Sequence, residues 1–380
     1  MVLASDAEKS LKSAKGGPAR KPGGPLRRGW TTGACAAAAA AAALRATLTD
    51  AAPDRVTIRL PKGETPTFDV ATAEKTADGW RIGIIKDAGD DPDVTHGAEV
   101  IVTLTPRAPG DGIIFKAGPG VGMVTLPGLP VAVGEPAINP GPRGIITDAL
   151  TAVAEELDGA PDAYVTISIP GGEEIALKTM NPRLGIKGGL SVLGTTGVVI
   201  PYSCASWINS IHRGVDVAKN QNIAHIIAAT GSTSEAAAMK AFPDLPEQAF
   251  IDMGDFAGGL LKYLRRAPVE KLTLVGGVAK LSKLAQGHLD LHSKRSSVDM
   301  IALAALARGV GANQEIGQQI AAANTAMQAW QICADAGVSL ADAIARGARE
   351  TAMAAVPGDV EIAVRVYDRT GIEVGRTDNA

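Results

Sequence analysis

The sequence predicts two domains, the second of them an α/β domain built on a mainly parallel sheet. Its 380 residues are more typical of two domains than of one. In the second half, three apolar runs with the pattern of buried strands are each followed by a glycine-rich turn and a helical segment. We expect these strands at residues 223–229, 247–253 and 271–275. This alternation favours a parallel sheet, whose ligands bind at the carboxyl ends of the strands.

The composition excludes several classes of protein. With 37 Lys+Arg against 40 Asp+Glu, a formal net charge of -3 and only 3% aromatic residues, the chain lacks the basic surface and the stacking platforms typical of nucleic-acid binding. Its 46% hydrophobic content is too high for a disordered chain. The 44 glycines and 23 prolines follow no repeating period, which excludes a fibrous protein. We expect these glycines to make turns and surfaces built from backbone.

The amino-terminal segment and the cysteines predict a cytoplasmic protein. Residues 1–25 are polar, basic and rich in glycine and proline, so we expect a flexible tail and no signal peptide. The longest apolar stretch, 34–44, is mostly alanine and too short to cross a bilayer. The three cysteines lie far apart, which fits a reducing compartment without structural disulfides. We expect no membrane or nucleic-acid partner and no protein-bound metal, and the sequence carries no signal for an oligomeric state.

The first predicted helix begins at Thr31 or Thr32 and continues through an alanine run. Either threonine is a suitable N-cap, and alanine is the strongest helix former. A helix faced with alanine presents a flat surface, so we expect its neighbours to pack very close to it. The N–H groups and two hydroxyls at Thr31-Thr32-Gly33 are also a candidate anion-binding site. Short strands are predicted to follow at 56–60, 67–71, 80–86 and 99–104.

A charged loop, KDAGDDPDVTHG at 86–97, lies between the last two of these strands. Its ionisable groups fit a cation site or an acid/base cluster, but a solvated turn explains the composition slightly better. The spacing does not match an EF-hand, so no dedicated calcium site is expected. The ionisable residues are Asp87, Asp90, Asp91, Asp93 and His96.

Two long segments rich in glycine, 110–144 and 180–199, flank a predicted helix at 145–157 and a predicted strand at 164–169. The first holds too many prolines for a central strand and is too long for an idle loop, so we expect such segments to line a ligand site. Arg143 precedes the helix, where a guanidinium suits an anionic group. The second segment contributes Arg183, Lys187, Gly188, Gly189, Thr195, Thr196 and Gly197.

The strand ends of the second half supply candidate ligand turns at 231–235, 252–259 and 276–280. Ser232 or Thr233 is expected to cap the helix after the first of these strands. No G-x-G-x-x-G and no P-loop motif is present in this half, which argues against a standard dinucleotide or P-loop site.

The segment GHLDLHSKRSSVDM, 287–300, holds two histidines with the spacing of metal ligands on a helix. The glycine and serines around His288 and His292 favour a loop, so we interpret the segment as the polar lining of a site and not as a metal centre. Alanine-rich helices to about residue 355 and a closing strand at 360–366 are predicted to complete the chain.

Eight segments, spread in order along the chain, together carry a resemblance to one family. They are TTGACAAAA at 31–39, KDAGDDPDVTHG at 86–97, AGPGVG at 117–122, EPAINPGPR at 135–143, NPRLGIKGGLSVLGTTG at 181–197, TGSTSE at 230–235, DMGDF at 252–256 and GGVAKLSKLA at 276–285. From about Leu26 onward the chain resembles the CbiD family, the cobalt-precorrin-5B C1-methyltransferases of cobalamin biosynthesis. The departures are Ala34, where a hydroxyl residue is expected, and the polar tail.

The resemblance implies an enzyme that uses S-adenosylmethionine to methylate C1 of (cobalt-)precorrin-5B and yields (cobalt-)precorrin-6A. It also implies an α+β domain similar to the second domain of ribosomal protein S5 at 26–200 and a Rossmann-like α/β domain at 201–357. A closing strand and tail would then occupy 358–380. No residue pattern distinguishes a ring that carries cobalt from one that does not.

The resemblance also assigns candidate roles to the motif residues. The anionic corrin ring would be held by Thr31, Thr32, Arg143, Arg183, Lys187, Thr195, Thr196, Lys280 and Lys283, because a ring fringed with carboxylates needs cations and hydroxyls spread around it. S-adenosylmethionine would be held by Gly231, Ser232, Thr233, Ser234, Glu235, Asp252, Gly276 and Gly277. The candidates for a general base are Asp87, Asp93, His96 and His288.

Two alternatives to a methyltransferase stay open at the level of sequence. One is a non-catalytic carrier of corrinoids or other tetrapyrroles, and the other is an enzyme that binds a phosphorylated metabolite at 231–235. Neighbouring enzymes of the cobalamin pathway are further expected partners.

Overall fold

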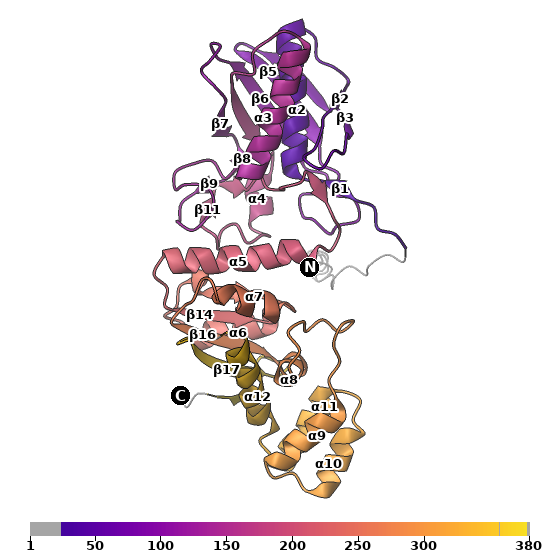
Figure 1. Ribbon diagram of the computed structural model, residues 1–380, viewed down its shortest axis with the longest axis vertical. Coiled ribbons are helices and arrows are strands. Elements are labelled where there is room, and N and C mark those ends of the chain that lie inside the picture. Colours follow the sequence, from indigo (N-terminus) through magenta and orange to yellow (C-terminus); the bar gives the residue numbers. More distant parts are fainter. Residues whose placement is uncertain (1–23, 357, 378–380) are drawn as a thin grey trace, which may run out of the picture. The chain divides into compact units, whose positions relative to one another are not determined.

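The computed structural model describes residues 24–356 and 358–377, so most of the predicted flexible tail, 1–23, and the last residues, 378–380, lie outside the described residues. The chain divides into two compact units (Figure 1). The first unit comprises residues 1–122, 136–179 and 188–202, and the second comprises 123–135, 180–187 and 203–380.

Two short segments of the predicted first domain therefore group with the second unit. The strands β9 (Met123–Val124) and β11 (Ile186–Lys187) pair antiparallel with each other. The position of a Cβ on Gly128 would lie 2.7 Å from the Cα of Val217, so this loop runs directly against the second unit's own backbone. These contacts bind 123–135 and 180–187 together, although other segments separate them in the sequence.

The first unit contains a five-stranded sheet with the order β4-β5-β6-β10-β7. The strands are β4 (Thr72–Thr76), β5 (Gly79–Ile85), β6 (Glu99–Pro106), β10 (Ala163–Ser168) and β7 (Ile114–Ala117). Neighbouring strands are antiparallel except β10 and β7, which are parallel. The helices α2 (Thr32–Thr49) and α3 (Pro140–Glu156) lie side by side over one face of this sheet (Figure 1). A separate hairpin joins β2 (Arg55–Thr57) and β3 (Thr67–Asp69).

The alanine run forms α2 as predicted, and its capping residue is Thr31. The Thr31 hydroxyl accepts a hydrogen bond from the Ala34 N–H at 3.2 Å. Residues 34–43 are all buried, each with an exposed fraction of at most 1%. Because alanine has only a methyl group, α3 and the strands β5 and β6 can pack close to α2.

The first glycine- and proline-rich segment is more structured than the sequence predicts. It contains β7, which joins the edge of the five-stranded sheet beside β10, and the short strand β8 (Gly120–Val121). The helix α3 begins at Pro140, five residues before the predicted start, because proline is well tolerated at the first helical positions. Only the stretches around these elements remain loop.

Three glycines in the first unit serve tight packing and not an open surface. The strand β8 pairs parallel with β12 (Gly189–Leu190), and the short helix α4 (Gly172–Ala176) follows β10. A Cβ on Gly120 would lie 1.8 Å from the Ile169 carbonyl oxygen, and one on Gly172 or on Gly189 would lie 2.3 Å from the Gly120 carbonyl oxygen. The expectation of backbone-built surface is therefore wrong at these positions, because backbone packs on backbone there.

The second unit contains a five-stranded sheet with the order β15-β14-β16-β17-β18. Its strands are β14 (His225–Ala229), β15 (Phe250–Asp252), β16 (Lys271–Gly277), β17 (Glu361–Tyr367) and β18 (Glu373–Arg376). The first four strands in this order are mutually parallel, and only β18 is antiparallel. The predicted mainly parallel sheet is thus confirmed, and the closing strand of the chain adds to it as β17. The 3₁₀ turn η1 (Glu247–Ala249) precedes β15.

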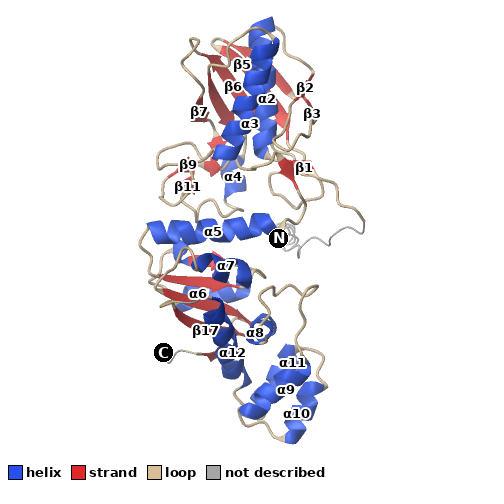
Figure 2. Ribbon diagram, in the orientation of Figure 1, coloured by secondary structure: helices blue, strands red, loops and turns tan. Residues whose placement is uncertain are grey.

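Helices connect and cover these strands. They are α5 (Cys204–Asn220), α6 (Ser232–Ala241), α7 (Ala257–Leu264), α8 (Val278–Ala285) and α12 (Leu340–Ala355). A further cluster consists of α9 (Met300–Gly309), α10 (Gln314–Ala321) and α11 (Ala326–Asp335) (Figure 2). The segment around His288 and His292 is a loop, as predicted. In the described part of the chain, no helix is both long and apolar enough to cross a membrane.

A short strand pair, the cysteines and the start of α6 are further local features of the described residues. The two-residue strands β1 (Gly29–Trp30) and β13 (Val198–Val199) pair antiparallel. All three cysteines are free. The expected cap at Ser232 or Thr233 is wrong: Gly231 is the N-cap residue of α6, Ser232 is the first residue of the helix, and no side chain caps its N-terminus. The Ser234 hydroxyl, inside the first turn, donates to the Gly231 carbonyl oxygen at 2.8 Å.

The packing of the three glycines predicts a large effect of a single methyl group. We expect Gly120→Ala to lower the free energy of unfolding by about 2–4 kcal/mol, because the methyl group meets the Ile169 carbonyl and the residue has a φ of +79°. The control is Gly144→Ala in α3, where nothing lies within 4 Å and alanine favours the helix. Urea unfolding measures both variants, and equal stabilities would contradict the packing described.

Candidate functional site

The charged loop 86–97 of the first unit is built around a buried ion pair. The Lys86 side chain is 1% exposed, and its Nζ donates to Asp93 Oδ2 at 2.5 Å. Asp93 Oδ1 accepts from the Thr95 N–H at 2.8 Å and from the Thr95 hydroxyl at 2.6 Å. Burial alone would raise the pKa of Asp93, but Lys86 and Thr95 outweigh it and lower the pKa. Asp93 is therefore an ionised partner of Lys86 and a weak proton acceptor.

Asp87 is held by the guanidinium of Arg27. Arg27 donates from both terminal nitrogens, with Nη2 2.9 Å from Asp87 Oδ1, and the Gly89 N–H donates to the same oxygen at 2.9 Å. The hydrogen bond from Arg27 is the largest cause that lowers the pKa of Asp87 to about 2. Asp90 accepts the Arg27 backbone N–H at 2.6 Å, and Asp91 accepts the Tyr202 N–H at 2.7 Å. These carboxylates organise the chain around the loop, and Asp87 is too weak a base to take up a proton near neutral pH.

The two histidines among the base candidates have different surroundings. The Ala88 N–H donates to His96 Nδ1 at 3.1 Å, so the neutral ring carries its proton on Nε2 and presents a hydrogen-bond donor. The ring is half exposed, and protonation of Nδ1 would break the bond from Ala88. His288 is half-buried, and within the described residues its ring nitrogens make no hydrogen bond. His288 is thus the base candidate whose ring has no hydrogen-bond partner among the described residues.

The predicted substrate hydroxyls of the first unit come together at the starts of α2 and α3. The Thr31 N–H donates to the Gly197 carbonyl at 2.9 Å, and a Cβ on Gly194 would meet the Thr31 side chain at 2.4 Å. A Cβ on Gly141, in the first turn of α3, would lie 3.0 Å from the Cα of Thr195. The loop that contains Thr195 and Thr196 therefore lies against the amino-terminal turns of both helices, whose partial positive charges favour anions. Thr32 is the first residue of α2 and is buried.

The carboxyl edge of the parallel sheet in the second unit carries the predicted cofactor residues. The strands β14, β15 and β16 end here, so the turns that begin at Thr230, Asp252 and Gly276 are adjacent. Lys280 Nζ donates to the Thr230 carbonyl and lies 3.1 Å from Asp255 Oδ1. A Cβ on Gly276 would lie 2.6 Å from the Thr230 hydroxyl oxygen. Gly276 is itself buried, and its lack of a side chain lets the turn at Thr230 pack directly against the end of β16.

Asp252 is the carboxylate with the most perturbed surroundings at this edge. Burial is the main cause that raises the pKa of Asp252, and the nearby Glu235 carboxylate raises it further. The Gly254 N–H donates to Asp252 Oδ1 at 3.2 Å. A group that donates hydrogen bonds or carries positive charge would stabilise the ionised form of Asp252. This chemistry matches ribose hydroxyls or a cationic sulfur and does not match a phosphate.

Four of the predicted substrate cations have partners inside their own unit. Arg183 Nη1 donates to Glu235 Oε1 at 2.6 Å and to the Phe250 carbonyl at 3.2 Å. Arg143 Nε donates to the Ile138 carbonyl at 2.8 Å. Lys283 is buried and donates to the Leu291 carbonyl at 2.8 Å, and Lys280 has the partners named above. The Lys187 side chain is exposed, and it forms no ion pair or hydrogen bond with any described residue.

The prediction from sequence missed Trp207 at the same edge. Its Nε1–H donates to the Asp252 carbonyl at 3.3 Å, and a Cβ on Gly254 would lie 3.2 Å from its ring. The ring is 46% exposed, which is unusual for tryptophan and suits a ligand contact. The only signal in the sequence was an aromatic residue on a polar helix face in a chain with few aromatics.

In residues 24–356 and 358–377, no three His, Cys, Asp or Glu side chains are grouped to hold a metal ion, and the absence of a protein-bound metal stays a prediction.

The protein thus has α/β units: the carboxyl edge of the parallel sheet in the second carries Asp252 beside Glu235, and the first has a group of threonines at two helix starts. Two family models match the chain, CbiD over residues 19–201 and CbiD, C-terminal domain, over residues 290–378. This chain belongs to the CbiD family, as the sequence motifs predict.

Named relatives resemble the chain over nearly its whole length. The cobalt-precorrin-5B C(1)-methyltransferase of Halorhodospira halophila is 53% identical over 359 residues, which cover 94% of this chain and 96% of that protein. The protein of the same name from Brucella anthropi is 56% identical over 348 residues, which cover 91% and 94%. A crystal structure of the cobalamin biosynthesis protein CbiD from Archaeoglobus fulgidus is 30% identical and matches 73% of this chain and 85% of that chain, with a TM-score of 0.38.

The environment of Asp252 predicts that this carboxylate destabilises the folded protein at neutral pH. Its pKa in the folded state is raised above the ordinary value of 3.8, so ionisation costs more in the folded than in the unfolded chain. This cost in the free energy of folding is absent below pH 3.8, and it reaches its full size once the pH exceeds the folded-state pKa of Asp252. We therefore expect Asp252→Asn to raise the melting temperature at pH 7 and to have little effect at pH 3.

The matched control is Asp244→Asn, which changes an exposed carboxylate that makes no hydrogen bond within the described residues. It should leave the melting temperature unchanged at both pH values. A fall in the melting temperature of Asp252→Asn at pH 7 would show that Asp252 stabilises the fold and that its environment is not as described.

Proposed function

We propose that this protein is a cobalt-precorrin-5B C(1)-methyltransferase that transfers a methyl group from S-adenosylmethionine to C1 of the corrin-ring precursor. The product is (cobalt-)precorrin-6A. The observation that carries this function is the 53% and 56% identity to relatives of that name over more than nine-tenths of the chain. We assign an S5-like fold to the first unit and a Rossmann-like fold to the second.

We assign the methyl donor to the carboxyl edge of the parallel sheet in the second unit. S-adenosylmethionine supplies a methyl group on a positively charged sulfur, and its ribose supplies two hydroxyl donors. Asp252 would accept from the ribose, and this contact would offset the burial and the repulsion from Glu235 that disfavour its ionised form. The backbone at Gly231, Gly276 and Gly277 would border the bound molecule.

The residues 232–235 have separate roles in this assignment. Ser232 and Thr233 are exposed at the start of α6 and are available to the donor, whereas Ser234 is buried and bonds to the backbone. Glu235 is paired with Arg183, so it sets the local charge and is less available to the ligand. Methyl transfer requires chiefly the alignment of the attacking carbon with the methyl group, so rigid positioning by the sheet edge is the main contribution of the protein.

The helix starts of the first unit are assigned to carboxylates of the substrate. Thr31, Thr32, Thr195 and Thr196 would supply hydroxyl and backbone donors there, and His96 would supply its Nε2–H. Asp87 and Asp93 hold the loop that presents His96. We assign uptake of any proton released from the ring to His288, whose ring nitrogens are available.

The alternative of a phosphorylated metabolite at 231–235 is disfavoured by charge. A phosphate there would meet the carboxylates of Glu235 and Asp252, and the pKa of Asp252 is already raised by Glu235. A non-catalytic carrier would bind the tetrapyrrole without a need for a methyl donor. The methyltransferase and the carrier are therefore distinguished by whether the bound tetrapyrrole gains a methyl group.

The test is incubation of the purified full chain with S-adenosylmethionine and cobalt-precorrin-5B, followed by mass spectrometry of the tetrapyrrole. A parallel incubation with cobalt-free precorrin-5B defines the metal state of the substrate. We expect the addition of one methyl group and the formation of one S-adenosylhomocysteine per turnover. The control omits S-adenosylmethionine. Binding of the tetrapyrrole with no change in its mass would support the carrier instead, and binding of neither ligand would overturn both.

A further inference from the structure

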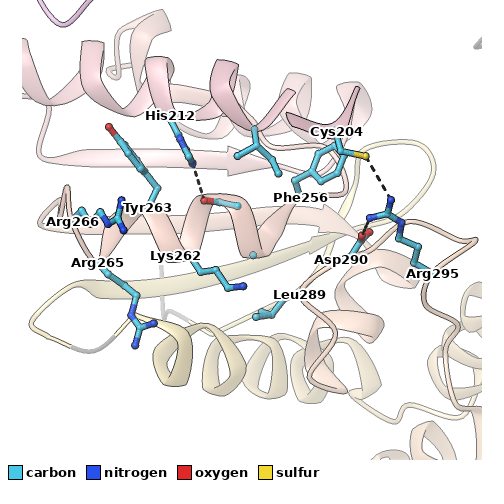
Figure 3. Close-up of a pocket in the computed structure, with 13 residues that line it drawn as sticks. Cys204, His212, Phe256, Lys262, Tyr263, Arg265, Arg266, Leu289, Asp290 and Arg295 are labelled. Carbon is cyan, nitrogen blue, oxygen red and sulfur yellow. Dashed lines mark hydrogen bonds and ion pairs between the residues drawn. The ribbon is translucent and has the colours of Figure 1, made fainter. Parts of the chain in front are cut away.

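A pocket in the second unit lies outside all the residues assigned so far to substrate or methyl donor. It is formed by α5, α7 and the loop after α8 (Figure 3) and has a volume of about 650 Å³, within the range typical of small-molecule sites. Its lining residues are Cys204, Ile208, His212, Phe256, Gly258, Gly259, Lys262, Tyr263, Arg265, Arg266, Leu289, Asp290 and Arg295.

The floor of the pocket is apolar and shallow. Ile208, Phe256 and Leu289 contribute the hydrocarbon surface. A Cβ on Gly258 would lie 2.9 Å from the Leu289 side chain, and one on Gly259 would lie 3.1 Å from the Ile208 side chain. These two glycines of α7 let α5 and the loop approach the helix closely, so the floor contains no projecting side chain between them.

One wall of the pocket is a fixed aromatic pair. His212 of α5 stacks on Tyr263 of α7 with ring centroids 3.9 Å apart and an interplanar angle of 11°, and the two rings face each other in Figure 3. The Tyr263 hydroxyl donates to Asp216, and His212 Nε2 lies 3.3 Å from the Gly259 carbonyl oxygen. Burial is the main cause that raises the pKa of Tyr263 to about 12, so the phenol stays neutral. The wall is therefore rigid and suits contact with a flat ligand.

The rim of the pocket carries an excess of positive charge. The four cations of the rim are Lys262, Arg265, Arg266 and Arg295. The one acidic lining residue is Asp290, which forms an ion pair with Arg295 at 2.8 Å. The other three cations are exposed, and within the described residues they form no ion pair. This contrasts with Arg183, whose charge is already balanced inside its unit. These three side chains are therefore a local group of cations whose charge is available to an anionic ligand.

The end of α7 explains only part of this charge. Cations in the last turn of a helix complement its dipole, which accounts for Lys262 and Arg265. It does not account for Arg295, which comes from the loop after α8, or for the apolar floor between the cations. An apolar floor with a cationic rim is complementary to a molecule that has a flat hydrocarbon body and carboxylates along its edge.

The pocket also adjoins the edge assigned to the methyl donor. Phe256, which lines the pocket, lies beside Trp207 with ring centroids 6.3 Å apart. Trp207 in turn donates to the Asp252 carbonyl. His288, the candidate proton acceptor, directly precedes the lining residue Leu289. The contact between the Phe256 and Trp207 rings therefore connects this pocket to the donor edge of the same unit.

We propose that this pocket binds one edge of the carboxylated corrin ring, with Lys262, Arg265, Arg266 and Arg295 on its carboxylates and the floor of α5 and α7 against its hydrocarbon face. This inference rests on the proposed function for the identity of the ligand. It gives the second unit a substrate site whose cations lie outside every motif, although Phe256, Gly258 and Gly259 belong to the predicted ligand turn 252–259.

The test compares wild type with the triple variant Lys262→Gln, Arg265→Gln, Arg266→Gln. We expect the KM for cobalt-precorrin-5B to rise about tenfold or more, because charge-assisted contacts to the carboxylates are lost. The Kd for S-adenosylmethionine and the circular dichroism spectrum should stay unchanged. The matched control is Lys240→Gln, Arg308→Gln, Arg369→Gln, which removes the same charge from exposed positions of the same unit outside the pocket. An equal KM in both triple variants would overturn the proposal.

A second probe keeps this test independent of the methyl transfer itself. Uroporphyrin, a tetrapyrrole with carboxylates around its whole edge, is titrated into each protein, and its Kd is measured by quenching of tryptophan fluorescence. We expect about tenfold weaker binding by the pocket variant than by wild type and by the control variant. If wild type forms no methylated product but shows this pattern, the proposed function fails and the site stands. If wild type methylates normally and the pocket variant binds uroporphyrin as tightly as the control, the site fails and the function stands.

Discussion

The parallel pairing of β14, β15 and β16 is the constraint on which the candidate site depends. In the register of this sheet, Ala229 lies opposite both Asp252 and Val275, so the three following turns begin at one edge. Segments of the sequence that are separated by more than twenty residues thereby become neighbours. The raised pKa of Asp252 follows from this placement, because the edge buries the carboxylate and brings Glu235 near it. A ligand with hydroxyl donors and positive charge is the natural complement of this edge.

Charge in this protein is divided between groups that serve the fold and groups left for ligands. Lys86 and Asp93 form a buried pair, and Arg27 and Asp87 fix the start of the described chain to the charged loop. Arg183 is balanced by Glu235. Lys262, in the last turn of α7, and Arg265 and Arg266, which follow that helix, have no such partners among the described residues. A net charge near zero therefore conceals a local excess of positive charge, and that excess is where a polycarboxylate has contacts to gain.

The sequence was sufficient for features that depend on local pattern. The alternation of apolar runs and glycine turns predicts the parallel sheet, Thr31 is the cap of the alanine helix, and eight ordered motifs identify the family. Features set by long-range pairing were not predictable in this way. β7 is a strand because β10 offers it an edge, and Gly120 is packed because Ile169 lies opposite, neither of which a local window contains. The partners of the cations are equally non-local, so the motif lysines and arginines were expected to face substrate. The unpaired cations at the end of α7 and directly after it lie outside every motif.

Photochemical cross-linking of methyl-tritiated S-adenosylmethionine to the full chain, followed by peptide mapping, tests most directly whether the donor binds at the carboxyl edge of the second unit. We expect label in peptides that contain residues 230–256 or 276–280, with competition by S-adenosylhomocysteine. Label confined to the first unit, in peptides that contain 31–39 or 86–97, would contradict it.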